Sequence, residues 1–506
     1  MSIKIQQDIM RIYTALFPFL LFILSFDNLE ASMFGYCNQK NISKTVLKTR
    51  TLGQYNMPFV DISFSNGLQD QENQKINLNI IATSTFSIDP TFGCEFAINR
   101  KPIMQIAGNN TPYAHSRDIE AELINGTSST VAQMNLGAEE SMVGARLFLQ
   151  IPFYRFWKND LFLDWFLSIR TTLTRLSRKL QMTLSSNDKD SLIPLYAFFN
   201  KQTAYGKIDN QTKIDVGLEN ITVTLDGIYY SPKQKFQIYY FSGIEIPTQS
   251  TYTSEYLFSP TIGNNGTIGI VLGGDFRGFF KTTDSYQLGL FFELEDHCML
   301  YKTSARTFDL YNTAAIEGTS SVSNKNKPWS RYLPAVSEKL ILENQTISAA
   351  STLPVRIHPC NVLDLSLGIL FEQYLNKNKE KCLISVGYNL WASQAEYAEL
   401  QDRVYAVQYQ KFYETGISGT LPHTTANNST IAKRFANDPT QKNLTFNDLD
   451  MGSVASDGGY SQSAFFRVSV INKNVYQILF GGWYEFGKSL IIPSRLGGWI
   501  GGGFEF

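Results

Sequence analysis

The feature that most constrains the fold of this chain is a long series of segments in which apolar and polar residues alternate. Across residues 143–157 most odd-numbered positions are apolar, whereas Arg146 and Gln150 lie on the other face. Alternation with a period of two is typical of a β-strand that has one face in an apolar environment. After the short turn 158–160, the segment that begins at Leu161 repeats the pattern, so the two segments form a hairpin with both apolar faces on one side.

Eleven strands of this kind are predicted from residue 143 to the carboxyl terminus. Most of them span about 10 residues or more, which exceeds the usual strand of a soluble sheet and suits a tilted transmembrane strand. A chain with so many long strands is expected to be all-β. The strands are 143–157, 161–172, 221–230, 236–246, 268–280, 286–300, 355–374, 382–390, 460–471, 475–486 and 495–506.

The connections between these strands are of two kinds. Turns of a few polar residues join the members of each hairpin, whereas long connections rich in Asn, Ser and Thr join one hairpin to the next. This asymmetry is typical of outer-membrane barrels, which have short periplasmic turns and longer extracellular loops. We therefore expect a transmembrane antiparallel up-and-down β-barrel with long loops at 176–215, 247–265, 301–354 and 391–459.

The number of strands depends on the sequence before residue 143. Three segments there are candidate strands: 55–64, 76–88 and 92–106. One additional strand closes a barrel of twelve, and all three close a barrel of fourteen. Both totals satisfy the even number expected of bacterial barrels, so we predict 12–14 strands and favour fourteen.

The amino terminus has the layout of a secretory signal peptide. Lys4 and Arg11 precede the apolar run 12–26, and Ala31 offers a small residue for cleavage. The run is shorter than the roughly 20 residues of a membrane-spanning helix, although an uncleaved anchor is the alternative. We divide the chain into a signal peptide (1–31), a periplasmic extension or plug (32–53) and the barrel (54–506).

Composition and motifs narrow the classes of function. With 44 basic and 45 acidic residues the net charge is −1, so the chain lacks the basic surface that nucleic-acid binding requires. The five cysteines contain no CxxC pair, and the four histidines lack the spacing of metal ligands. No GxSxG or HExxH motif occurs. We expect no enzymatic activity, no catalytic residues, no metal and no cofactor.

The last eight residues resemble the carboxyl-terminal assembly signal of bacterial outer-membrane proteins. Gly501, Phe504 and the terminal Phe506 match the glycine and aromatic positions of that pattern, while Trp499 replaces its polar residue. The resemblance implies that the barrel-assembly machinery of a Gram-negative bacterium recognises the chain. It also implies that the mature protein resides in the outer membrane, in contact with its lipids.

A second resemblance concerns three segments near the middle of the chain. Residues 218–221, 244–248 and 258–264 are similar to segments of barrels grouped with hydrophobic-compound transporters. This resemblance implies passive transport of small solutes, with hydrophobic compounds among the candidates.

Residues opposite the apolar faces are expected to line the lumen. Eight acidic and four basic side chains occupy such positions, which predicts a weak preference for cations in a pore. They are Arg146, Asp164, Arg170, Asp226, Glu245, Asp275, Arg277, Glu293, Glu295, Arg356, Asp364 and Glu372. An alternative role for these residues is a network of ion pairs that fills a narrow barrel. Aromatic residues near strand ends or on outward faces are expected to form the interfacial girdle, namely Trp157, Trp165, Tyr229, Tyr240, Trp483, Tyr484 and Phe486.

These features favour an outer-membrane channel or transporter through which small solutes diffuse. The main alternative is an adhesin or structural barrel that binds partners through its long loops. An outer-membrane hydrolase and a secreted eukaryotic glycoprotein are two further classes. The abundance of Asn-x-Ser/Thr triplets suits only the last of them. The oligomeric state and the identity of the solute are left open.

Overall fold

The structure is a computed structural model in which the chain divides into two units, residues 1–40 and 41–506. All described residues belong to the second unit. The predicted signal peptide, the candidate strand 55–64 and the terminal Phe506 lie outside them. The described residues are 50, 76–114, 116–152, 163–203, 205–230, 236–248, 253–264, 266–283, 285–312, 325–327, 329–332, 346, 348, 351–376, 380–400, 411–413, 441–443, 449–472, 476–487 and 493–505.

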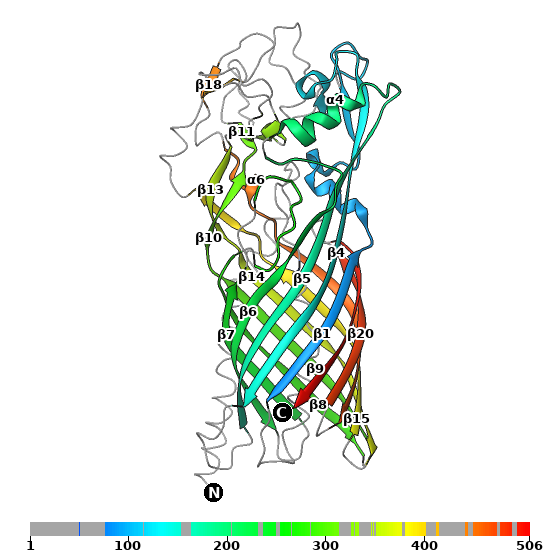
Figure 1. Ribbon diagram of the computed structural model, residues 1–506, viewed down its shortest axis with the longest axis vertical. Coiled ribbons are helices and arrows are strands. Elements are labelled where there is room, and N and C mark those ends of the chain that lie inside the picture. The colour runs from blue at the N-terminus through cyan, green and yellow to red at the C-terminus, as the bar shows by residue number, and fades with distance from the viewer. Residues whose placement is uncertain are drawn as a thin grey trace. The chain divides into compact units, whose positions relative to one another are not determined.

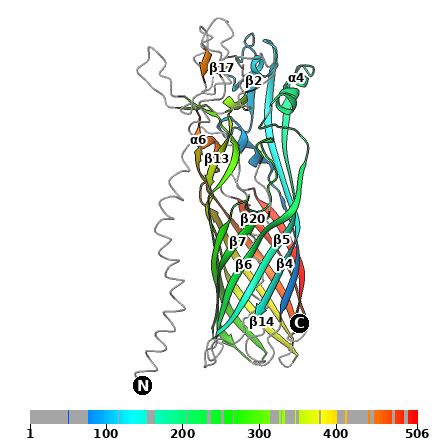
Figure 2. The same ribbon diagram turned by 60° about the vertical axis from the view of Figure 1, so that its left-hand side comes forward.

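Antiparallel strands close into a barrel (Figures 1 and 2). Closure occurs at β1 (Asn77–Ser87), which pairs with β21 (Arg495–Glu505) on one side and β4 (Val131–Pro152) on the other. The hydrogen-bonded sheet has 14 strands, but β2 (Met104–Ala107) and β3 (Ile119–Glu120) extend from β4 and take no part in closure, which leaves twelve. The predicted all-β barrel is confirmed. The other barrel strands are β5 (Leu163–Ser185), β6 (Lys213–Tyr230), β7 (Phe236–Pro247), β8 (Gly269–Thr282), β9 (Tyr286–Met299), β14 (Cys360–Asn376), β15 (Glu380–Ser393), β19 (Gly459–Asn472) and β20 (Tyr476–Gly487).

The favoured count of fourteen barrel strands is wrong because one candidate strand forms another structure. Residues 76–88 form β1 as predicted, whereas 92–106 begins with two 3-10 helices, η2 (Pro90–Phe96) and η3 (Ile98–Arg100), and reaches strand β2, outside the closed barrel, only at Met104. The side chain of Asp89 accepts a hydrogen bond from a backbone N–H two residues later, at 2.9 Å, and a proline begins η2. This cap and this proline start a helical turn where the hydrophobic pattern indicated a strand.

The hairpin of β4 and β5 continues well beyond the barrel. β1 pairs with β4 only from Ser141 to Gln150, so residues 131–140 pass the rim together with 178–185 of β5. At about 3.3 Å per residue this extension is roughly 30 Å long. Residues 176–185, predicted as the start of a loop, are therefore strand. Their apolar side chains still alternate, and these are buried.

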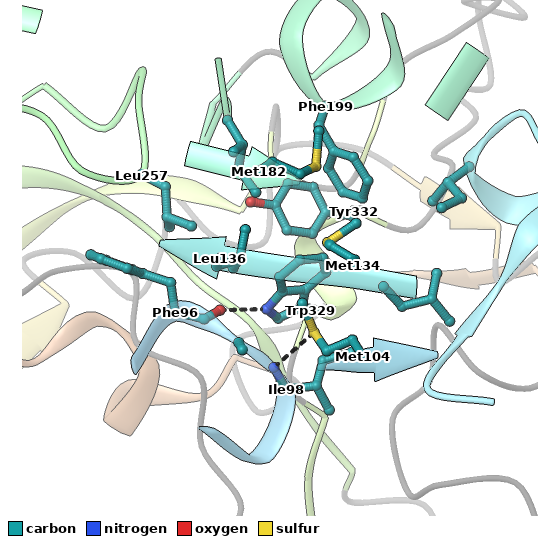
Figure 3. Close-up of a cluster of buried hydrophobic side chains, with 14 of the residues drawn as sticks. Phe96, Ile98, Met104, Met134, Leu136, Met182, Phe199, Leu257, Trp329 and Tyr332 are labelled. Carbon is teal, nitrogen blue, oxygen red and sulfur yellow. Dashed lines mark hydrogen bonds between the residues drawn. The ribbon is translucent and has the colours of Figure 1, made fainter. Parts of the chain in front are cut away.

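Beyond the rim, the long connections form what we call the cap, defined by the buried apolar cluster that includes Phe199, Trp329 and Tyr332 (Figure 3). The indole N–H of Trp329 donates to the carbonyl oxygen of Phe96 at 2.7 Å, and the rings of Phe199 and Tyr332 meet edge-on with centroids 5.2 Å apart. The two longest predicted loops thus contain packed structure. The remaining elements outside the barrel are η4 (Ala121–Ile124), α4 (Leu192–Ala197), η5 (Phe198–Gln202), β10 (Lys302–Thr307), β11 (Leu310–Asn312), β12 (Lys325–Lys327), η6 (Ser330–Tyr332), β13 (Thr352–His358), β16 (Tyr397–Leu400), β17 (Lys411–Tyr413), β18 (Gln441–Asn443) and α6 (Met451–Val454).

The outward face of the barrel is apolar. Leu290, Leu367 and Ile369 are 53%, 49% and 55% exposed, and similar side chains occupy outward positions on the neighbouring strands. A soluble protein seldom exposes so continuous an apolar surface, whereas the hydrocarbon layer of a membrane covers it. None of the described helices combines the length and apolar character of a membrane-spanning segment.

Candidate channel lumen

The inward face of the barrel carries most of the predicted lumen residues. Eleven of the twelve lie on barrel strands, and their side chains are buried or half-buried. The alternation in the sequence therefore separates a polar inner wall from an apolar outer wall.

The exception among the predicted lumen residues is Arg356. It lies on β13, which pairs with β10 and β16 and not with the barrel. The predicted strand 355–374 is interrupted at Pro359 and at Cys360, whose φ of 57° is left-handed. A proline followed by such a backbone ends a ladder of hydrogen bonds, so the residues before it join the cap.

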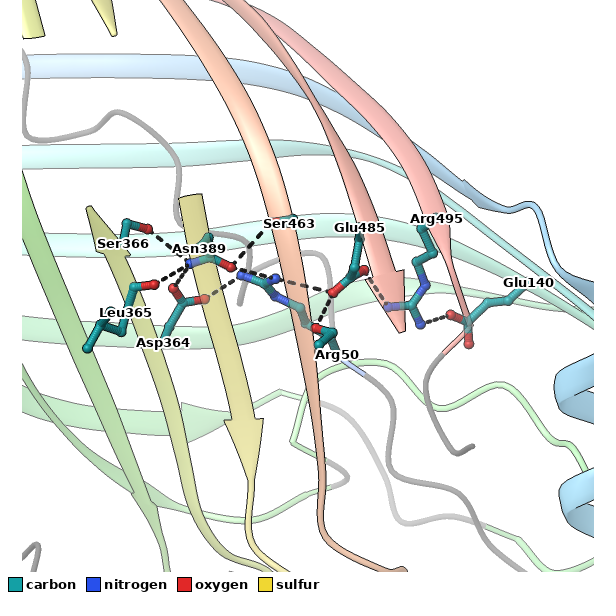
Figure 4. Close-up of polar contacts among 10 residues, drawn as sticks. Arg50, Glu140, Asp364, Leu365, Ser366, Asn389, Ser463, Glu485 and Arg495 are labelled. Carbon is teal, nitrogen blue, oxygen red and sulfur yellow. Dashed lines mark hydrogen bonds and ion pairs between the residues drawn. The ribbon is translucent and has the colours of Figure 1, made fainter. Parts of the chain in front are cut away.

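A continuous chain of ion pairs follows the inner wall near the end of the barrel that carries the long connections. Figure 4 shows the chain from Asp364 to Glu140. Arg495 Nη1 lies 3.3 Å from Glu485 Oε2, and Arg178 Nε lies 2.8 Å from Glu140 Oε2. Arg495 also pairs with Glu140. The chain passes over eight neighbouring strands, from β14 round to β5. We call it the rim chain, and its members in order are Asp364, Arg50, Glu485, Arg495, Glu140 and Arg178.

Arg50 belongs to the segment before β1, yet its guanidinium is inside the barrel and 1% exposed. Its Nη1 lies 3.3 Å from Glu485 Oε1 and donates to Asn389 Oδ1 at 3.1 Å, while its Nη2 pairs with Asp364. The Asn389 amide also donates to Asp364 and, at 2.9 Å, to Ser366 Oγ. Arg50 therefore links β14, β15 and β20 through the lumen.

A second cluster lies on β5, β7 and β9. Here His297 Nδ1 is 3.0 Å from Glu245 Oε2, and His297 Nε2 is 3.3 Å from Glu295 Oε1. Arg170 Nη2 approaches the same oxygen of Glu295 at 3.2 Å. The Asn264 amide donates to Glu245 Oε2 at 2.9 Å. Two carboxylates thus meet an imidazole and a guanidinium.

Two further ion pairs lie midway along the lumen. Arg277 Nε is 3.0 Å from Asp275 Oδ2, which matches the pairing expected for residues two apart on one strand face. Arg467 Nη1 is 2.7 Å from Glu293 Oε1. The guanidinium carbon of Arg467 also lies 5.1 Å from the centre of the Phe465 ring, within the range of a cation–π contact.

Two tryptophans face the lumen and stack on each other. The ring centroids of Trp483 and Trp499 are 5.3 Å apart with planes at 27°, and both residues are buried. Each ring crosses a glycine of the neighbouring strand, because a Cβ on Gly497 would lie 2.2 Å from Trp483 and one on Gly481 would lie 2.3 Å from Trp499. The assignment of Trp483 to the girdle is wrong, since it shares strand parity with the inward Glu485.

Several inward charges escaped the sequence analysis. Strand parity was a sufficient signal for most of them; Arg467, for example, has the parity of the inward Phe465 and Ser469. Arg50 had no such signal, because no strand was predicted around it. The missed residues include Arg50, Glu140, Arg178, Glu219, His297, Lys381, Arg467, Glu485 and Arg495.

A closed barrel of twelve strands with an apolar outer wall and a charged inner wall is the architecture typical of proteins of the bacterial outer membrane. The chain has the fold of an outer-membrane β-barrel protein. Within the described part of this protein, no group of three or more His, Cys, Asp or Glu side chains is arranged to hold a metal ion.

No protein-family model matches the sequence, and no curated protein matches it either. Among solved structures, the barrel protein is similar to an outer-membrane channel from Pseudomonas putida F1, with 9% identity and a TM-score of 0.37 over 87% of this chain and 100% of that one. It is also similar to the transport unit of the autotransporter AIDA-I from Escherichia coli, with 10% identity and a TM-score of 0.31 over 88% of this chain and 97% of that one. A third similar structure is a deletion mutant of the monoaromatic hydrocarbon channel TodX, with 8% identity and a TM-score of 0.31 over 89% of this chain and 94% of that one.

Proposed function

We propose that this barrel protein is a channel through which small solutes diffuse across the outer membrane. The observation that supports the proposal is the charged inner wall, on which ion pairs occur from the rim chain to the middle of the lumen. Buried ion pairs add little stability compared with apolar packing of the same volume. A barrel that served only as a scaffold would gain little from so many charges, whereas a path for water and polar solutes requires them.

The composition of the inner wall suggests which solutes pass. Charged side chains alternate with aromatic surfaces at Phe465, Trp483 and Trp499. Such a wall suits small solutes that combine a polar group with an apolar body, and hydrophobic compounds are included in the proposal. Passage is diffusion, and no chemical step on the solute is proposed.

Residues 32–53 act in this proposal as a plug and not as a periplasmic extension. The support comes from Arg50, whose buried guanidinium contacts Asp364, Asn389 and Glu485 inside the barrel. In this proposal the plug held by that contact narrows the lumen. Conductance of the intact protein is therefore expected to be small or intermittent.

Planar-bilayer recording tests the channel. The wild type should give discrete conductance steps, and its reversal potential under a salt gradient should indicate a weak preference for cations. Changing Glu293 and Glu295 to Gln leaves the partner arginines Arg467 and Arg170 uncompensated, so the reversal potential should move towards anion selectivity. Absence of conductance in the wild type and in a variant without the Arg50 anchor would contradict the proposal.

A second candidate function, an adhesin or structural barrel, is favoured by one observation. The cap has its own buried apolar core, with Phe199, Trp329 and Tyr332 at its centre. A packed core holds a surface in a fixed shape, which a binding protein needs. Binding of a soluble partner by a non-conducting barrel would favour this function over the channel.

The proposed partners follow from the outer-membrane location. Lipids cover the apolar wall around Leu290 and Leu367. The barrel-assembly machinery is proposed to recognise the strand β21, where Gly501 and Phe504 lie, together with Phe506.

A further inference from the structure

The sheet of β10, β13 and β16 presents one face to the outside of the cap. Pairing places Thr303 opposite Arg356 and Arg356 opposite Glu399. The next residues along form a second row, in which His358 is paired with Tyr397 and Tyr301 lies just before β10. These residues alternate with buried ones, so the sheet has a core face and an outer face. We call the outer face the tyrosine face, and its members are Tyr301, Thr303, Arg356, His358, Tyr397 and Glu399.

The aromatic row of the tyrosine face forms a continuous platform. The imidazole centre of His358 lies 5.7 Å from the ring of Tyr301 and 5.8 Å from the ring of Tyr397. Both tyrosines are nevertheless 58% exposed. Aromatic side chains of this size contribute to stability mainly by burial, so the exposed rings stabilise the cap little.

Charged groups flank these rings within the same face. The guanidinium carbon of Arg356 lies 3.5 Å from the centre of the Tyr301 ring, and His358 Nε2 lies 3.8 Å from Glu399 Oε2. A guanidinium stacked on a ring keeps its N–H donors available at the edge of the stack. The platform therefore offers apolar ring faces, donors and a carboxylate acceptor side by side.

The position of the tyrosine face in the chain places it at the outer edge of the membrane. The last lipid-facing residue after β9 is Leu300, which is 45% exposed and directly precedes Tyr301. On the neighbouring strand, His358 lies two residues before the start of β14. The tyrosine face thus continues the apolar outer wall at the end that carries the long connections, where an outer-membrane barrel meets the polar headgroups of the outer leaflet.

We propose that the tyrosine face binds the saccharide headgroup of an outer-leaflet glycolipid. Sugar rings have apolar C–H faces that stack on exposed aromatic rings, as Tyr301 and Tyr397 provide. Their hydroxyl groups and acidic substituents hydrogen-bond with donors and acceptors such as Arg356, His358 and Glu399. Continuity with the lipid-covered wall selects a membrane glycolipid over a soluble glycan or a protein partner. This inference does not depend on whether the lumen conducts.

Thermal unfolding of the full barrel in vesicles tests the inference. The probe is lipopolysaccharide added to phosphatidylethanolamine vesicles, and a second arm uses its core oligosaccharide without the lipid part. Both additions should raise the unfolding midpoint of the wild type. Replacing Tyr301 and Tyr397 together by Ser should weaken the apparent affinity for the oligosaccharide by about tenfold or more, since each ring contact contributes on the order of a threefold to tenfold effect. Arg356→Gln should weaken it as well.

The matched control is Tyr476→Ser. Tyr476 begins β20 at the other end of the barrel and is 38% exposed. The control variant therefore loses a comparable outward ring away from the tyrosine face. The control should respond to both additions like the wild type. Equal responses of the control and the double tyrosine variant would overturn the inference. A response to intact lipopolysaccharide with none to the core oligosaccharide would also overturn it, because the acyl chains would then account for the effect.

Discussion

Replacing Arg50 by Gln should both destabilise the barrel and open its lumen. Arg50 pairs with Asp364 and Glu485, and all three side chains are at least nine-tenths buried. Glu485 keeps Arg495 as a partner at 3.3 Å, whereas Asp364 keeps only the Asn389 amide among its described contacts. Leaving one buried charge without its cation costs about 3–5 kcal/mol. Water entering the lumen reduces this penalty, so we expect a loss of about 3 kcal/mol.

In the proposed plug, the contacts of Arg50 with Asp364 and Glu485 hold the plug in the lumen, so the same free energy sets how often it is released. If the segment moves between an inserted and a released position, a loss of about 3 kcal/mol changes that equilibrium by more than about a hundredfold. Single-channel recording should therefore show long open periods or a larger conductance in Arg50→Gln than in the wild type. Urea unfolding of the same samples measures the loss of stability.

Two variants separate the anchor from a general weakening of the barrel. Arg467→Gln removes an equally buried lumen arginine from its pair with Glu293, so it should destabilise the barrel without prolonging the open state. Adding Asp364→Asn to Arg50→Gln removes the unpaired carboxylate, so stability should recover while the lumen remains open. A folded Arg50→Gln protein with wild-type conductance, or an Arg467→Gln protein with the same opening, would refute the reasoning.

Three further predictions concern other parts of the barrel protein. Leu290→Arg should lower the free energy of unfolding in vesicles by about 2–4 kcal/mol, and the inward Gln287→Arg on the same strand should cost less; equal losses would contradict the assignment of faces. Burial, with Arg306 nearby, lowers the pKa of Lys302 in the cap to about 7. The folded cap therefore binds fewer protons than the unfolded chain above that pH, so its stability to urea should rise from about pH 7 to 10, and Lys302→Met should remove the slope. Deleting Phe506 should reduce the heat-modifiable barrel in the outer membrane while export to the periplasm continues; an unchanged amount of barrel would argue against the assembly signal.

The barrel could be predicted from the sequence because a single physical requirement repeats on every strand. Lipid on one side and a polar lumen on the other impose a period of two, and this period continues through residues 131–152 and 163–185 of the long hairpin. The eleven predicted strands after residue 143 are all present. Parity within a strand also placed eleven of the twelve predicted charges on the inner face, and it failed only where Pro359 and Cys360 end the ladder before β14.

The cap could not be predicted in this way because its core is assembled from single residues in many connections. Trp329 packs against Phe96 and Phe199, which lie more than a hundred residues earlier, and short irregular segments carry each of them. No local period marks such residues. The helices near residue 90 were missed for a related reason, since a cap residue and a proline determine the start of a helix independently of the apolar pattern.

Arg50 shows a different limit of sequence reasoning, because its role depends on charges contributed from other strands. Asp364 and Glu485 lie on β14 and β20, which are separated in the sheet by β15 and β19, and neither is close to Arg50 in the sequence. Parity predicts that Asp364 faces inward but gives no reason for a cation to meet it there. The curvature of the sheet around the lumen brings these two carboxylates within reach of one guanidinium. The charge of Arg50 and the charges of the wall are therefore complementary as a consequence of this curvature, and variants that change one without the other should lose the contact of Arg50 first.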